Sequence, residues 1–99
     1  MMRPALDPAV AGIVRAVRAH VGGMVVIVGV ETVEWSPLMF TGARHTLALR
    51  LDTPAQADAM AAALPDHEFA IHGHLVADVA EIVVDGPLLR FAALTLEDR

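Results

Sequence analysis

The strongest local signal in the sequence is a helix start in the middle of the chain. Thr53 can act as the N-cap, Pro54 occupies the first helical position, and Gln56 stands where the second half of a capping box belongs. We expect this helix to continue to about Leu64, where Pro65 ends it. Strand-forming segments flank the helix, so the sequence predicts a strand–helix–strand unit with a right-handed crossover.

A second helix is predicted over residues 8–21. Asp7 is a suitable N-cap, Pro8 takes the first helical position, and Gly22 follows the last turn. Between these signals, apolar residues recur at helical spacing: Val10, Ile13, Val14, Val17 and Val21. This helix is therefore expected to bury one face.

The remaining segments have the character of strands: residues 24–34, 44–51, 68–71, 74–84 and 87–97. A turn within residues 36–43 would make the first two antiparallel. We expect residues 1–99 to form one α+β domain of order α-β-β-α-β-β-β, a two-layer sandwich with both helices on one face of a mostly antiparallel sheet. Its α-β-β-α-β part has the element order of a ferredoxin-like domain without the first strand, an analogy of shape alone.

The last hairpin has a register that can be predicted. If Val83 faces Leu88, then Glu81 falls opposite Arg90 and the two charges pair across the strands. Pro87 has no N–H group, so we expect a loop of four residues. The pattern leaves open whether Gly73 breaks residues 68–84 into two strands or only bulges one.

The chain is unusually apolar, with 56% hydrophobic residues even before its 7 glycines are counted. Soluble domains reach about 45–50% with glycine included. In the last hairpin both faces are apolar: one would carry Val76, Ala80, Ile82, Val84, Leu89, Phe91 and Ala93. The other would carry Leu75, Ala77, Val79, Val83, Leu88, Ala92, Leu94 and Leu96. Helices cover only one face, so we expect a second copy to cover the other, in a homodimer or a higher homo-oligomer. A pocket for an apolar ligand is the alternative.

Charge and composition exclude several functions. Twelve acidic residues against seven arginines give a net charge of −5, and no basic stripe for nucleic acid or for an anionic membrane is present. The longest uncharged apolar run, residues 21–30, is too short to span a bilayer. The absence of cysteine excludes thiolate catalysis, disulfides and cysteine-bound zinc. A cytoplasmic location is the default expectation.

Three histidines, His67, His72 and His74, form a candidate metal site. Residues two apart in a strand point to the same side, so His72 and His74 can present two imidazoles to one divalent metal, with Asp66 or Asp78 as a further ligand. The alternative is a set of surface histidines beside a polar turn.

Trp35, Arg44 and His45 form a candidate ligand-binding site around the first hairpin loop. Arg44 can hold a carboxylate or a phosphate, and His45 can act as an acid or a base. Alternatively, Trp35 and Phe40 pin the end of the hairpin, Arg44 lies along Trp35 or pairs with Glu34, and His45 only begins a strand.

No spacing of acids, histidines or hydroxyls predicts a catalytic set. We therefore expect a self-associating binding or assembly module with no cofactor. The alternative is a small-ligand or metal-dependent enzyme that uses Arg44 and His45, or His72 and His74. The sequence does not identify the small molecule that such a site would take.

Overall fold

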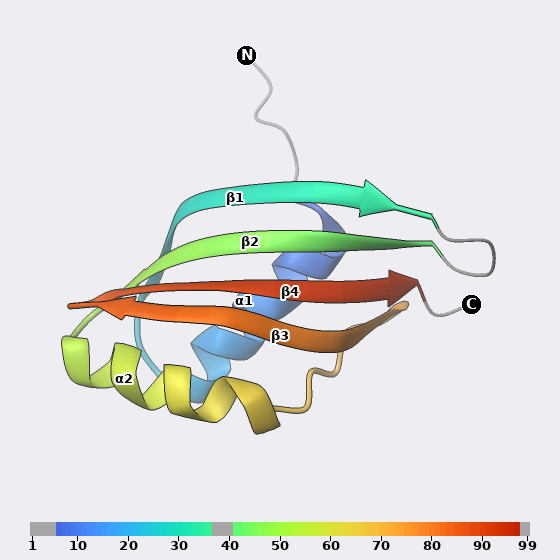
Figure 1. The fold of residues 1–99 in the computed structure, drawn as a ribbon. Helices are drawn as coiled ribbons and strands as arrows, with labels where there is room; N and C mark the ends of the chain where they lie inside the picture. The colour runs from blue at the N-terminus through green and yellow to red at the C-terminus, as the bar shows by residue number, and fades with distance from the viewer. Residues whose placement is uncertain (1–5, 37–40, 98–99) are drawn as a thin grey trace, which may run out of the picture.

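A computed structural model describes residues 6–36 and 41–97 as two helices and one four-stranded sheet. Its elements are α1 (Pro8–Val21), β1 (Val25–Trp35), β2 (Gly42–Leu51), α2 (Pro54–Ala63), a short 3₁₀ turn (Leu64–Asp66), β3 (His74–Asp85) and β4 (Leu88–Glu97). The sheet order is β1-β2-β4-β3, and all neighbouring strands are antiparallel. Both helices lie on one side of the sheet (Figure 1). The expected two-layer α+β architecture is confirmed.

The strand β4 lies in the interior of the sheet although it is the last strand in the chain. Because β2 and β3 both run antiparallel to β4, they are parallel to each other and are joined through α2, which makes a split β-α-β unit. Moving β4 to the front of the chain would give the β-α-β-β-α-β order of the ferredoxin-like fold. The strand β4 thus takes the place in the sheet that the first strand has in a ferredoxin-like domain.

Both helix starts are confirmed by their capping bonds. The N–H of Ala9 donates to Oδ1 of Asp7 at 2.8 Å, and the N–H of Gln56 donates to Oγ1 of Thr53 at 3.1 Å. One detail differs from a capping box: Oε1 of Gln56 accepts from the N–H of Asp52 and not from that of Thr53.

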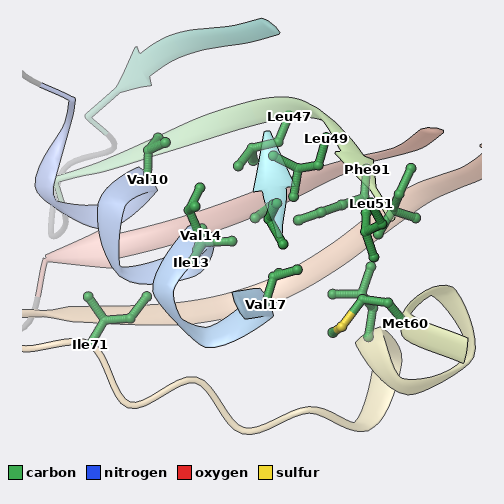
Figure 2. Close-up of a cluster of buried hydrophobic side chains, with 14 residues drawn as sticks. Val10, Ile13, Val14, Val17, Leu47, Leu49, Leu51, Met60, Ile71 and Phe91 are labelled. Atoms are coloured by element: carbon green, nitrogen blue, oxygen red, sulfur yellow. The ribbon is translucent and has the colours of Figure 1, made fainter. Parts of the chain in front are cut away.

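The core lies between the helices and the covered face of the sheet. From α1, Val10, Ile13, Val14 and Val17 are buried against that face, as Figure 2 shows for the side chains labelled there. The buried residues of the sheet include Leu47, Leu49, Leu51, Leu89 and Phe91, and α2 adds Met60. The predicted stripe of α1 therefore packs as expected.

The strand predicted over residues 68–71 is wrong, so the order is α-β-β-α-β-β. Only Ile71 makes an isolated bridge, to His74, across a turn that contains Gly73 at φ +80°. Ile71 instead packs on α1, where a Cβ on Gly12 would lie 2.7 Å from its Cγ2 atom. Packing against α1 buries the side chain of Ile71. The turn at Gly73 then leads directly into β3. Residues 37–40 of the predicted first-hairpin turn, including Phe40, lie outside the described residues.

The predicted register of the last hairpin is also wrong. Asp85 pairs with Leu88, and Val83 pairs with Arg90, so the turn has two residues instead of four. Gly86 adopts φ +57° at the first turn position, a conformation that glycine allows at little cost. Pro87 takes the second turn position, where the ladder requires no N–H group.

Two bulges in β3 redirect the side chains that follow them. The register shifts between Val76 and Asp78 and again between Ala80 and Val83. At the second shift Glu81 has φ +55°, and its carboxylate pairs with Arg44 of β2 and not with Arg90. The strand β4 lies between β2 and β3, so this ion pair crosses β4 on the face away from the helices. The bulges also place Ala80 and Val79 on faces opposite to those predicted.

Candidate functional sites

The three residues of the predicted ligand site lie on two different faces of the sheet. Neighbours in a strand point to opposite sides, and His45 is fully buried on the helix side whereas Arg44 is exposed on the other. Trp35 shares the face of Arg44, because Val33, which stands two positions before Trp35 in β1, pairs directly with Arg44. The structure thus brings Trp35 and Arg44 to one face and separates them from His45.

His45 is held by two threonines that the sequence analysis did not select. Its Nδ1 atom lies 2.9 Å from Oγ1 of Thr32 in β1, and its Nε2 atom lies 2.9 Å from Oγ1 of Thr95 in β4. The hydroxyl of Thr95 donates to the carbonyl oxygen of Ala43 at 3.4 Å. Thr95 then accepts from an Nε2–H group. In the neutral imidazole, whose proton is on Nε2, Nδ1 accepts from the hydroxyl of Thr32.

A signal for this network is present in the sequence. His45 stands in steps of two residues from Leu47, Leu49 and Leu51, and residues two apart in a strand point to the same face. His45 therefore belongs to the buried face. A histidine in such a row needs polar partners from the neighbouring strands. The identity of Thr32 and Thr95 as those partners depends on the strand order, which the sequence analysis did not predict.

Burial lowers the pKa of His45 below its usual value of 6.5. Asp7 opposes this shift and His74 adds to it. Burial disfavours the imidazolium form because that form loses its hydration. The lowered pKa favours the neutral ring, in which Nε2 donates to Thr95 and Nδ1 accepts from Thr32.

A polar cavity of about 110 Å³ lies beside His45. It is formed where the start of α1 meets one end of the sheet, and its lining includes Asp7, Glu34, Gly42, His45, His74, Thr95 and Glu97. The cavity has room for a few water molecules. Both ring nitrogens of His45 are engaged by threonines, so the imidazole would have to break a hydrogen bond before it could exchange a proton with a bound molecule. The arrangement is that of a structural histidine.

The acid sensitivity of the fold is expected to depend on His45. The pKa of this group is lower in the folded protein than in the unfolded chain, so the unfolded chain binds more protons. The stabilisation is complete above about pH 6.5 and is lost as the pH falls through the folded-state pKa. Unfolding by denaturant at about pH 7.5 and about pH 5 should show a larger loss for the wild type than for His45→Gln, whose amide does not titrate. Equal losses would contradict this assignment.

The candidate metal ligands are spread over different environments. His67 packs edge-on against Phe69, with ring centroids 4.6 Å apart, and against His20 of α1, at 5.7 Å. His72 and His74 flank the turn at Gly73, where Nδ1 of His74 lies 3.3 Å from the carbonyl oxygen of His72. Within residues 6–36 and 41–97, no three His, Cys, Asp or Glu side chains are placed to hold a metal ion. The structure does not bring His67, His72 and His74 together with Asp66 or Asp78.

The face of the sheet away from the helices is uncovered and carries exposed aliphatic side chains together with charged ones; we call it the open face. Five of its aliphatic residues are 45–56% exposed, namely Val26, Val28, Val33, Leu75 and Val83. Next to the Gly86–Pro87 turn, at what we call the turn end, it carries Val26, Val28, Ala48, Arg50, Val83, Asp85, Leu88 and Arg90. At the opposite end, the far end, it carries Val33, Trp35, Arg44, Leu75, Asp78, Leu94 and Leu96. Glu31 lies between the two ends, level with Ala92.

The turn end of the open face is hollow. A depression of about 190 Å³ is lined by Val28, Ala48, Val83, Asp85, Leu88, Leu89 and Arg90. A cavity of roughly 150 Å³ can hold a benzene ring, so this hollow is of the size that accepts an aliphatic side chain. Within the described part of the chain, the only ion pair is Arg44–Glu81, and Arg50 and Arg90 have none.

Comparison of the chain with family models, with curated proteins and with solved structures finds no match. In the described ranges, no helix is long and apolar enough to cross a membrane. The site geometry is therefore the sole basis for a functional assignment.

Proposed function

We propose that the protein is a self-associating binding or assembly module whose open face is covered by a second copy of the chain. The observation that carries the proposal is the row of exposed aliphatic residues on that face. Isolated exposed apolar residues are ordinary, whereas a contiguous apolar surface usually marks an interaction site. Symmetric association of identical copies is the commonest way to bury such a surface.

The dimensions of the open face support this proposal. Four strands about 4.8 Å apart, each of roughly ten residues rising about 3.3 Å per residue, give a footprint of roughly 600 Å². The accessible area of a corrugated face exceeds its footprint, and a standard interface takes about 800 Å² from each partner. A dimer of ordinary size can thus form through this face alone.

An enzymatic role has less support. The candidate residues Arg44 and His45 lie on opposite faces, and His45 already uses both ring nitrogens. His72 and His74 belong to no group that could hold a metal within the described ranges. The module we propose is cytoplasmic and has no nucleic-acid or membrane partner, in keeping with its acidic composition.

The substitution Val83→Glu is expected to convert a dimer into a monomer. Val83 is 55% exposed and lines the hollow of the open face, so a carboxylate there costs little in a monomer but would be desolvated in the dimer. Sedimentation equilibrium at high micromolar concentration should give twice the 10.5 kDa chain mass for the wild type and about that mass for the variant.

Met24→Glu is the matched control, because Met24 is 66% exposed but lies outside the sheet. This variant should remain dimeric. A wild-type protein that sediments as a monomer would refute the proposed self-association. A dimer that survives Val83→Glu would move the interface away from the open face.

A further inference from the structure

We infer that the two copies stack with their open faces together about a two-fold axis that runs across the strands, so that the turn end of each copy covers the far end of the other. This inference rests on the proposed function and adds the orientation of the partner. It is carried by two independent features of the open face, its charge distribution and its shape.

The two ends of the open face differ in charge once the Arg44–Glu81 ion pair, which is neutral as a whole, is set aside. At the turn end, Arg50 and Arg90 outnumber Asp85, and neither arginine has an ion-pair partner in the described ranges. At the far end, Arg44 is paired with Glu81, which leaves the carboxylate of Asp78 as the remaining charge. Glu31 of the edge strand β1 lies level with Ala92 and belongs to neither end. An axis across the strands places the positive end of each copy on the negative end of the other. An axis along the strands would gather the arginines of both copies at one end.

The shape of the face favours the same orientation. An axis across the strands lays β4 over β4 of the second copy in the opposite direction, with Ala92 near the centre. Leu94 and Leu96 of one copy then face Arg90 and Leu88 of the other, because these residues lie at equal distances on either side of Ala92. The two leucines thus meet the hollow at the turn end. Aliphatic side chains of the far end would thus fill the hollow of this face.

The orientation brings Arg90 close to Asp78 of the second copy. In β3, Asp78 pairs with Leu94 of β4, and Leu94 is the residue that faces Arg90 across the interface. The guanidinium and the carboxylate therefore come within reach of each other. The two-fold axis repeats the contact, so one substitution alters two contacts in each dimer.

A charge-reversal cycle tests the contact. We expect Arg90→Glu and Asp78→Arg each to raise the dimer dissociation constant about tenfold or more, because each creates two like-charge contacts. The double variant Arg90→Glu/Asp78→Arg should restore most of the affinity, since it exchanges the charges and keeps the pair. Sedimentation velocity over a concentration series measures all four proteins. Circular dichroism confirms that each variant remains folded.

Two controls change the net charge by the same amounts on the helix side. Arg15→Glu in α1 and Asp58→Arg in α2 replace exposed residues, and both should leave the dissociation constant within about twofold of the wild type. They separate a specific contact from a general effect of protein charge.

The outcomes distinguish the orientation from the proposed function. A restored dimer in the double variant supports the antiparallel stacking. The orientation is overturned if Val83→Glu disrupts the dimer but the effects of Arg90→Glu and Asp78→Arg on the dissociation constant add in the double variant. That result leaves self-association in place. A wild-type monomer overturns both and assigns the open face to a different occupant.

Discussion

The substitution Phe91→Ala is expected to lower the free energy of unfolding by about 4 kcal/mol, the largest effect of any single substitution considered for this chain. Phe91 is fully buried at the middle of β4, where it pairs with Leu47 of β2. Its other neighbours in the sheet are Glu81 and Ile82 of the β3 bulge. Removing the ring leaves a cavity that the surrounding strands cannot close without losing their register.

This loss is a large part of the stability expected for a domain of this length, about 5–15 kcal/mol. Phe91→Leu therefore serves as a milder variant, with an expected loss of roughly 1–2 kcal/mol. Met24→Ala is the control, because Met24 is largely exposed. Denaturant unfolding measures all three variants. A loss for Phe91→Ala as small as that for Met24→Ala would remove Phe91 from the centre of the core.

The second largest effect is expected from Gly42→Ala, a loss of about 2 kcal/mol. A Cβ atom at Gly42 would lie 2.6 Å from the carbonyl oxygen of Thr95, and also close to the side chains of Leu96 and Trp35. The carbonyl belongs to the backbone of β4, so it can retreat only if the β2–β4 pairing is disturbed. Thermal or denaturant unfolding gives the size of the loss.

Gly29→Ala is the matched control, because Gly29 is also a strand glycine on the open face and has no atom within 4 Å of its added Cβ. We expect this variant to be neutral or more stable by up to about 1 kcal/mol, since alanine restricts the unfolded chain. Equal effects at the two positions would show that close approach to Thr95 does not limit position 42.

The helices could be predicted from the sequence because their signals are local. Asp7 and Thr53 cap them within three residues, and the apolar stripe of α1 repeats every turn. Such signals do not depend on which strands become neighbours. The positions of the long strands were predictable for the same reason, since runs of β-branched residues stand between clear turn signals.

The pairing of the last hairpin could not be predicted, because two bulges in β3 decide it. Glu81 adopts a positive φ that no local pattern of a non-glycine residue indicates. Its partner Arg44 is 37 residues away in the chain, so their contact exists only once β4 has entered between β2 and β3. A register predicted from the sequences of β3 and β4 alone includes neither the bulge at Glu81 nor its contact with Arg44.

The candidate sites show the same division. Arg44 and His45 are neighbours in one strand and therefore point to opposite faces of the sheet. Their separation could have been predicted from the sequence. The cavity beside His45 could not, because its lining comes from α1 and from all four strands. The open face was predictable in part. The sequence indicated its exposed aliphatic residues, whereas the positions of its charged residues depend on the order and register of the strands.

The interior position of β4 has a consequence for folding during synthesis. On the ribosome, β1, β2 and β3 are all made before β4, yet β2 and β3 have no common neighbour until β4 is inserted. The first hairpin can form early, whereas β3 waits with both of its edges unpaired. Long-range pairing of this kind is slow, and exposed edges invite association with other chains. The nascent chain is thus most vulnerable to aggregation just before its final strand emerges.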